Sequence, residues 1–321
     1  MNKNIAFKFF ISLILSGFLL TACSNKNTGS IVDDMFDTES NDNGQLTQAD
    51  YEFPFGPNDI EIPVKINEDK LEYEIYIDNR ASAAEFGIMI AIDGIPQIST
   101  LGNDNSMMHK VSLKTGEYET YKFIMEKGNL EIDSGKEHII YPLIILEPDY
   151  IPTNRNHFIH EGKLSASKGL QFVCETDKQL GIKIGNVKPV KIDDRFKSEY
   201  NIKKNFGFEN QILWNLDTTN NAFISLEDLS KGFDINLIGD NIGEMRIFLF
   251  INKHSVSING YDCYDIKIQS GMVTKINVEL DKSIISKLRN DDSIFLIALP
   301  KNSESVDAWP YKTRTKIVKG I

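Results

Sequence analysis

From residue 51 onward, hydrophobic and polar residues alternate in short runs that are rich in Ile, Val, Tyr and Phe. The runs "LEYEIYID" (71–78), "YETYKFIME" (118–126) and "YDIKIQS" (264–270) show this period of two, and Gly, Asn, Asp and Pro separate such runs. A period of two predicts strands in antiparallel sheets, and many short strands at this spacing are typical of a β-sandwich. Only 225–231 and 282–289 have the pattern of helices. We therefore expect an all-β chain.

The strand pattern occurs twice along the chain. When Gly116 is set against Gly271, residues 111–127 lie over residues 266–282 without a gap, and the alternating apolar positions coincide. The flanking strands repeat in the same order: 73–94 with 233–253, and 141–148 with 294–300. This order predicts two tandem immunoglobulin-like β-sandwich domains, with chance agreement between similar strands as the alternative. The predicted domains span residues 51–175 and 176–321.

The amino-terminal residues have the layout of a secretory signal. Lys3 and Lys8 precede an apolar run from Phe9 to Leu20, and the chain becomes polar at Ser24. The run is shorter than the roughly 20 apolar residues that a membrane-spanning helix needs. We therefore expect a cleaved signal peptide and no permanent transmembrane helix.

The end of this run, Leu20, Thr21, Ala22 and Cys23, resembles the lipobox of bacterial lipoproteins. In that family the signal peptidase recognises the residues before the cut and cleaves just before a cysteine that carries a diacylglyceryl thioether. The resemblance implies that residues 1–22 are a signal peptide and that Cys23 is the lipidated first residue. Two acyl chains, such as palmitate, each contribute about 0.8 kcal/mol per buried CH₂ and hold a protein on a membrane. The expected location is the extracytoplasmic face of the cell membrane; an ordinary secretory signal is the alternative.

Charge narrows the range of partners. The net charge is −11, and removal of residues 1–22, which hold two lysines and no acid, makes it −13. An acidic surface repels nucleic acid and anionic lipid headgroups, so we expect no nucleic-acid partner and a membrane contact made by lipid. Residues 23–50 are rich in Asn, Asp, Ser, Thr and Gly, which predicts a flexible acidic tether with a span of roughly 30 Å.

Two further cysteines, Cys174 and Cys263, fall in the predicted closing strand of the first domain and inside the second domain. An oxidising compartment permits a disulfide, but the two α-carbons would have to approach within about 7 Å across the domain boundary. Free cysteine is among the most often buried residues. We expect two buried free thiols, with a bridge between them as the alternative.

Two fragments, "SASK" (165–168) and "KTG" (114–116), resemble motifs of penicillin-binding proteins and β-lactamases. In those enzymes the serine begins a helix, whereas Gly169 and an alternating strand follow it here, and the order of the fragments is reversed. We interpret them as a polar turn and a hairpin loop. The chain has no GxSxG, HExxH, GxGxxG, CxxC or P-loop motif, and we interpret its five histidines as satisfied or exposed side chains. We expect a non-enzymatic protein without a cofactor.

The loop "DTTNNAFISLED" (217–228) resembles an EF-hand calcium loop. Its oxygen donors at the first, third, fifth and twelfth positions are Asp217, Thr219, Asn221 and Asp228. An alanine replaces the glycine that permits the sharp turn, and an aspartate replaces the bidentate glutamate. The alternative interpretation is an Asx-rich loop in which Ser225 caps a short helix and Asp228 takes the place of the capping-box acid. We therefore expect no metal site and keep these four donors as candidates.

Aromatic residues near the ends of the predicted domains are candidates for a binding surface. Trp309 and Tyr311 flank Pro310 before the last strand, and Tyr150 lies in the corresponding region of the first domain. Amphipathic rings suit ligand stacking. The alternative is that these rings plug the open end of each sandwich.

Three classes of function fit these observations. The first, which we favour, is a non-enzymatic lipoprotein that binds a protein or glycan partner at the cell surface or serves an envelope complex. The second is a solute-binding lipoprotein of a transporter, although such receptors are usually α/β and this chain lacks βαβ patterning. The third is an envelope hydrolase with an unrecognised site. A pocket that holds a Ser/His pair would favour the third class, and a shallow surface would favour the first.

Overall fold

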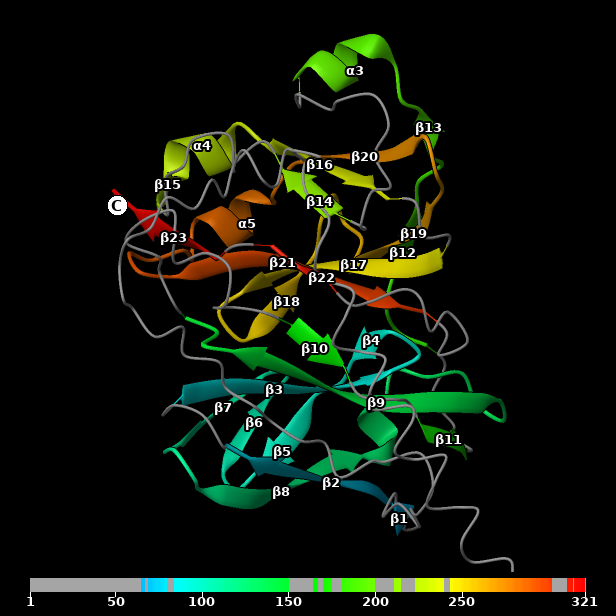
Figure 1. The fold of residues 1–321 in the computed structure, drawn as a ribbon, viewed down its shortest axis with the longest axis vertical. Helices are drawn as coiled ribbons and strands as arrows, with labels where there is room; N and C mark the ends of the chain where they lie inside the picture. Colours follow the sequence, from blue (N-terminus) through cyan, green and yellow to red (C-terminus); the bar gives the residue numbers. More distant parts are fainter. Residues whose placement is uncertain are drawn as a thin grey trace, which may run out of the picture.

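The computed structural model describes residues 65–66, 69–79, 84–149, 164–166, 170–174, 180–199, 211–214, 223–239, 243–301, 311–313 and 315–320. These residues form strands with a few short helices (Figure 1). Within these ranges we find no helix of the length and apolarity that a membrane span requires. The prediction of an all-β fold is therefore confirmed.

The strands form four sheets, which we name the first outer, first inner, second inner and second outer sheets. The first outer sheet has the order β1 (Lys65–Ile66), β2 (Lys70–Asp78), β8 (Tyr118–Glu126), β5 (Ser99–Leu101) and β6 (Asp104–Ser106). The first inner sheet has the order β10 (Leu164–Ala166), β9 (Glu137–Leu146), β3 (Ala84–Ile92) and β4 (Ile95–Pro96), with β11 (Leu170–Val173) on β9 and β7 (His109–Leu113) on β3. Together these two sheets make the first sandwich.

The second sandwich repeats this arrangement. Its inner sheet has the order β12 (Ile184–Asn186), β19 (Cys263–Ile268), β17 (Gly243–Ile251), β21 (Ser293–Pro300), β23 (Lys316–Lys319) and β15 (Phe223–Ser225), with β18 (His254–Val256) on β17 and β22 (Tyr311–Lys312) on β21. Its outer sheet has the order β13 (Val190–Lys191), β20 (Met272–Val278), β16 (Phe233–Ile238) and β14 (Gln211–Trp214). Two edge pairs, β12 with β19 and β15 with β23, are parallel, and the other described pairs are antiparallel.

The two sandwiches share one strand register. Tyr121 lies opposite Ile75 in the first outer sheet, and Ile276 lies opposite Ile235 in the second, as the alignment of Gly116 with Gly271 predicts. Both glycines have positive φ angles, 77° and 72°, in tight turns that join an inner-sheet strand to an outer-sheet strand (β7 to β8 and β19 to β20), where a residue without a Cβ atom is favoured. In the inner sheets the register places Ile140 and Leu146 in the positions of Ile294 and Pro300. Residues 140–146 therefore correspond to residues 294–300, and the predicted order of the flanking strands is found in both sandwiches.

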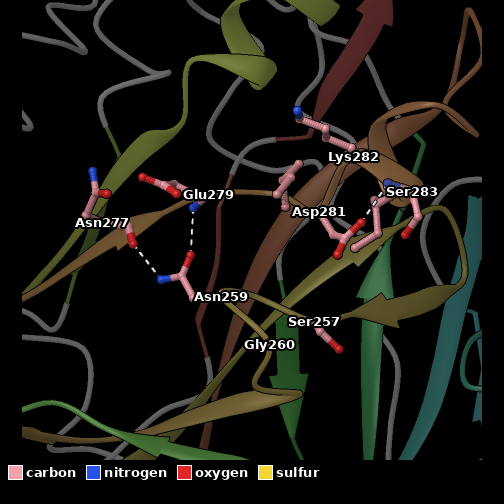
Figure 2. Close-up of a pocket in the computed structure, with 10 residues that line it drawn as sticks. Ser257, Asn259, Gly260, Asn277, Glu279, Asp281, Lys282 and Ser283 are labelled. Atoms are coloured by element: carbon pink, nitrogen blue, oxygen red, sulfur yellow. Dashed lines mark hydrogen bonds between the residues drawn. The ribbon is translucent and has the colours of Figure 1, made fainter.

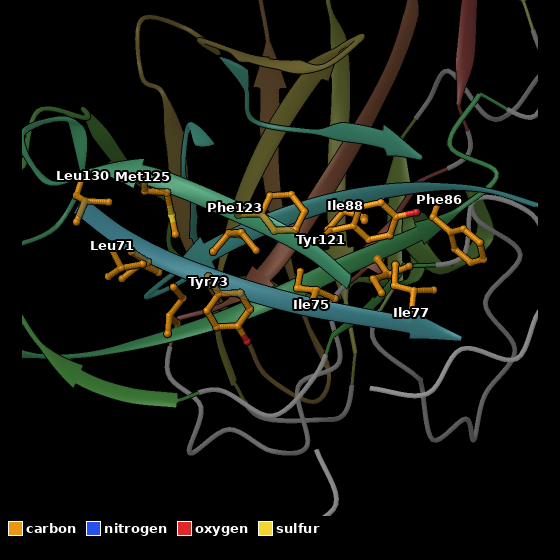
Figure 3. Close-up of a cluster of buried hydrophobic side chains, with 14 of the residues drawn as sticks. Leu71, Tyr73, Ile75, Ile77, Phe86, Ile88, Tyr121, Phe123, Met125 and Leu130 are labelled. Atoms are coloured by element: carbon orange, nitrogen blue, oxygen red, sulfur yellow. The ribbon is translucent and has the colours of Figure 1, made fainter. Parts of the chain in front are cut away.

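Each sandwich has its own apolar core. In the first, alternate residues of β2 and β8 point toward β3 and β9 and are fully buried (Figure 3); they include Tyr73, Ile75, Phe123 and Met125. The second core is built in the same way from the opposing faces of β16, β20, β17 and β21. Because successive side chains of a strand point to opposite faces, and only one face of each outer sheet lies on a core, apolar and polar residues alternate along the outer-sheet strands.

A third apolar layer lies between the two inner sheets. Strands β3 and β9 pack against β17 and β21, and the order of layers is first outer, first inner, second inner and second outer (Figure 1). This interface contains Met89, Leu143, Phe248, Phe250, Phe295 and Ile297, each at most 3% exposed. The rings of Phe250 and Phe295 are stacked with centroids 5.4 Å apart. Burial on both faces joins the sandwiches into one four-layer body.

Polar contacts surround this apolar interface. Arg246 on β17 donates to the carbonyl oxygen of Asp93 at 2.9 Å and pairs with Asp265 at 2.8 Å. Elsewhere on the interface, the ammonium of Lys253 lies 3.2 Å from the carboxylate of Asp104. Gly94 approaches the second sandwich so closely that an added Cβ would lie 2.7 Å from the Pro300 carbonyl oxygen. These contacts fix the relative position of the sandwiches.

The helices are short. Helix α4 (Leu226–Ser230) matches the predicted helix at 225–231. Helix α5 (Lys282–Ile285) is shorter than the prediction of 282–289, because the chain turns after Ile285 and inserts Leu288 into the second core. Helix α3 (Asp194–Glu199), which the sequence pattern did not indicate, lies over the second outer sheet (Figure 1).

Candidate functional site

An open hollow of about 920 Å³ lies at one end of the second sandwich (Figure 2). The connection between β18 and β19 forms one side of it, and the end of β20 with helix α5 forms the other. Its polar lining comes from Ser257, Asn259, Asn277, Glu279, Asp281, Lys282 and Ser283. Hydroxyls, amides, two carboxylates and an ammonium therefore line one space.

The wall formed by Asn259 is rigid. Asn259 and Gly260 form a two-residue turn with positive φ angles of 53° and 79°, which is the geometry that an Asn-Gly pair favours. The side-chain amide of Asn259 donates to the carbonyl oxygen of Asn277 at 2.7 Å, and the backbone N–H of Glu279 donates to its amide oxygen at 2.7 Å (Figure 2). Both ends of one amide thus fasten the turn to strand β20.

The opposite wall is also held by a hydrogen bond. The carboxylate of Asp281 accepts from the backbone N–H of Ser283 at 2.7 Å, and this bond holds the pKa of Asp281 below its ordinary value. The described lining residues include neither histidine nor cysteine. The hollow therefore offers fixed donors and acceptors for a polar partner, but no paired nucleophile and base.

A Ser/His/Asp cluster does occur in the first sandwich. The Oγ of Ser99 lies 3.0 Å from Nε2 of His109, and Nδ1 of His109 lies 3.2 Å from a carboxylate oxygen of Asp104. These side chains come from β5, β6 and β7, so they meet only in the folded sheet. No local sequence motif marks this cluster, because the three residues are separated by other strand and turn residues.

The geometry of this cluster is structural rather than catalytic. Ser99 and His109 are each 1% exposed, so a substrate cannot reach the hydroxyl. Nε2 of His109 also lies 3.1 Å from the carbonyl oxygen of Ser99. Burial lowers the pKa of His109, against the attraction of Asp104. For Asp104, partial burial opposes hydrogen bonds from Lys253 and Ser106, and the net effect is a lowered pKa. The cluster satisfies buried polar groups beside the interface between the sandwiches.

Most of the residues proposed from sequence lie outside the described residues. These are Leu20, Thr21, Ala22, Cys23, Tyr150, Asp217, Thr219, Asn221 and Trp309. Tyr311 belongs to β22, but its side chain is not described. The lipid site, the full calcium loop and the aromatic surface therefore stay predictions.

Asp228 is the candidate calcium ligand that the structure describes, and it takes part in a helix cap. The Ser225 hydroxyl accepts a hydrogen bond from the Asp228 backbone N–H at 3.1 Å and donates one to the Asp228 carboxylate at 2.7 Å. Gln211–Trp214, which precedes this loop, is a strand and not the entering helix of an EF-hand. Within the described ranges, no group of three His, Cys, Asp or Glu side chains could hold a metal.

The two described cysteines are buried free thiols, as predicted. Cys174 belongs to the core of the first sandwich, whereas Cys263 belongs to the interface layer. Burial raises the pKa of Cys263 to about 12, so its thiolate form is scarce at neutral pH. The two thiols lie in different packing layers. The alternative prediction, a disulfide between them, is therefore wrong.

No protein-family model matches this chain, and no curated protein matches it significantly. Among solved structures, the CupB2 chaperone of Pseudomonas aeruginosa is 6% identical, with 77% of this chain and 93% of that chain covered and a TM-score of 0.22. The CupB6 tip adhesin of the same organism is 9% identical, with 85% and 98% covered and a TM-score of 0.22. The secreted serine protease VesC of Vibrio cholerae is 8% identical, with 85% and 51% covered and a TM-score of 0.24. Scores this low carry no argument about function.

Proposed function

We propose that this chain is a lipid-anchored, non-enzymatic binding or accessory protein of the bacterial cell envelope. Its anchor is a diacylglyceryl group on Cys23, and its partner is a protein or a glycan on the extracytoplasmic side. The lipobox-like residues Leu20–Cys23 support the anchor. The observation that carries the binding role is the open polar hollow with rigid walls on a four-layer β body.

Several features favour binding over catalysis. The described strands form sheets without βαβ units, which disfavours the usual architecture of solute receptors. The hollow is open and lacks a nucleophile–base pair among its described lining residues, and the Ser99–His109 pair is inaccessible. A preorganised polar surface loses little conformational entropy on binding, so it suits recognition.

The lining of the hollow carries two acidic side chains and one basic side chain. Glu279 and Asp281 supply carboxylates, and Lys282 supplies the ammonium. Side chains of both signs, together with the Asn259 and Asn277 amides, suit a neutral polar partner such as a sugar or a peptide backbone. We therefore place the recognition surface at this end of the second sandwich.

A cross-linked pull-down from the bacterial envelope tests this proposal. We expect Glu279→Lys to lose the partner that the wild-type chain recovers, because the substitution reverses a charge in the hollow. Glu126→Lys is the matched control, since Glu126 is an exposed glutamate on the first outer sheet. Equal recovery by both variants would exclude the hollow as the recognition surface. Cys23→Ser, tested in parallel, separates anchoring from partner recognition.

A further inference from the structure

The outward face of the second outer sheet is covered by the chain that precedes it. Strand β13 pairs with β20 so that Val190 lies opposite Val273, and the backbone N–H of Ile192 donates to the carbonyl oxygen of Gly271 at 3.1 Å. Helix α3 follows, and its Phe196 is 3% exposed. The outward positions Val273 and Ile238 are consequently 1% and 2% exposed. Residues 192–199 thus act as a cover for this sheet.

The cover is held by a short sequence pattern. The carboxylate of Asp193 accepts a hydrogen bond from the backbone N–H of Phe196 at 2.7 Å, which caps the helix. The ammonium of Lys275, on the outward face of β20, lies 4.7 Å from the centre of the Phe196 ring. The aspartate thus orients the turn, and the phenylalanine packs on the sheet.

The first outer sheet has the same register but a different surface. Asp78 and Tyr118 are paired in the positions that Ile238 and Val273 occupy in the second sheet. Tyr118 is 69% exposed, and its ring centroid lies 5.8 Å from that of Tyr76. A large aromatic side chain is therefore open at the position where the second sandwich is covered.

A second copy of the cover sequence stands in the amino-terminal part of the chain. Residues 32–39, "VDDMFDTE", match residues 192–199, "IDDRFKSE", with both aspartates, the phenylalanine and the glutamate identical. Val replaces Ile and Thr replaces Ser at two of the other positions. The number of residues that separates the two copies also separates Tyr73 from Phe233. The alignment of the two halves of the chain therefore runs without a gap from the cover to the first core strand.

We propose that residues 32–39 dock on the outward face of the first outer sheet and cover Tyr118, as residues 192–199 cover Val273. By equivalence, Asp33 caps the turn, Phe36 packs beside Tyr118 above Thr120, and the backbone N–H of Val32 donates to the carbonyl oxygen of Gly116. The Phe36 and Tyr118 rings bury apolar area against each other, which favours docking.

Charge distinguishes the two covers. Arg195 and Lys197 of the second cover correspond to Met35 and Asp37 in residues 32–39. The sheet below the first cover also carries carboxylates, among them Asp78. Like charges therefore oppose docking of residues 32–39, and salt, which screens them, strengthens it.

Docking shortens the connection between the proposed lipid anchor and the first sandwich. Only residues 24–31 remain between Cys23 and the cover, and a flexible chain of that length spans roughly 15 Å, compared with roughly 30 Å for the whole of residues 23–50. The docking itself does not depend on lipidation. If residues 32–39 dock and Cys23 is lipidated, the first sandwich lies close to the membrane surface.

Engineered disulfides test the docking in the full mature chain with Cys23→Ser. The test pair is Ile31→Cys with Glu117→Cys. The equivalent pair in the second sandwich, Lys191→Cys with Met272→Cys, joins two residues that lie directly opposite each other and serves as the positive control. Ile31→Cys with Glu126→Cys places the second thiol at the far end of β8 and serves as the negative control. Cys174 and Cys263 are buried and do not compete.

We expect the Ile31/Glu117 pair to oxidise within one chain at a rate near that of the positive control and roughly tenfold faster than the negative control. Added Phe36→Asp is expected to reduce this rate to that of the negative control, and added salt to raise it. Equal rates for the two Ile31 pairs, or a disulfide that links two chains, would overturn the proposal.

Discussion

The hydroxyl of Tyr141 donates a hydrogen bond of 3.0 Å to the carbonyl oxygen of Pro300, and these two residues belong to different sandwiches. Tyr141 lies in the apolar layer between the inner sheets, where it is 6% exposed. Interfaces between domains that move are usually more polar than this layer. The contact therefore belongs to a permanent interface, and the two sandwiches act as one body.

Loss of an aromatic ring at this interface is expected to destabilise both sandwiches. Phe250 is fully buried and stacks on Phe295, so Phe250→Ala leaves a cavity and lowers the free energy of unfolding by about 3–5 kcal/mol. Urea unfolding monitored by hydrogen exchange in each sandwich measures the effect. Phe223→Ala, at a position that is 43% exposed, is expected to change stability by about 0.5 kcal/mol or less. A first sandwich that keeps wild-type protection in Phe250→Ala contradicts the single-body account.

The Tyr73 hydroxyl is expected not to stabilise the folded state. It is fully buried in the first core, no described residue hydrogen-bonds it, and burial raises the pKa of Tyr73. Phe233 occupies the equivalent position in the second sandwich. Tyr73→Phe is therefore expected to leave stability unchanged or to raise it by about 1 kcal/mol, as measured by thermal or urea unfolding.

Tyr141→Phe is the matched control, because it removes a hydroxyl that has a partner. We expect this variant to lose about 1 kcal/mol. If Tyr73→Phe is as destabilising as Tyr141→Phe, then the Tyr73 hydroxyl has a partner in the folded protein and the prediction is wrong.

Stability is expected to fall in mildly acidic solution because of His109. Its pKa is lowered from the ordinary 6.5 by burial, so the folded state favours the neutral ring. Below about pH 6.5 the unfolded chain binds the proton more readily, and the free energy of unfolding therefore decreases. His109→Gln should flatten this dependence between pH 6.5 and 5, whereas His254→Gln, at an exposed position, should not. Identical pH profiles for wild type and His109→Gln would reject the assignment.

The two described thiols are expected to be inert in the folded state. Cys174 and Cys263 are 2% and 0% exposed, and the raised pKa of Cys263 disfavours its reactive thiolate. A thiol reagent should modify them only at the rate of unfolding and to completion in denaturant. Fast labelling of either cysteine in buffer would show that the packing around it opens in solution.

The sequence predicted the strands and their register because the outer-sheet strands are buried on one face. In "LEYEIYID" the residues at alternate positions enter the first core, and the matching glycine turns align the two sandwiches. Equivalent turns at Gly116 and Gly271 were therefore predictable from local chemistry.

The interface between the sandwiches was not predicted. Strands β3, β9, β17 and β21 are apolar on both faces, as in "FGIMIAI" and "SIFLIAL", and such runs are typical of strands buried on both sides. That pattern shows that something covers the second face, but not which sheet does. The Asn-Gly pair at Asn259 could likewise have located a turn, whereas its amide contacts with β20 depend on the folded sheet.

The proposed function depends most on the modification of Cys23. Mass spectrometry of the amino-terminal peptide from purified bacterial membranes measures it directly. The account predicts a mature chain that begins at Cys23 and carries a diacylglyceryl group, with Cys23→Ser released from the membrane fraction. A chain that retains residues 1–22, or one that begins at Cys23 with an unmodified thiol, would contradict it.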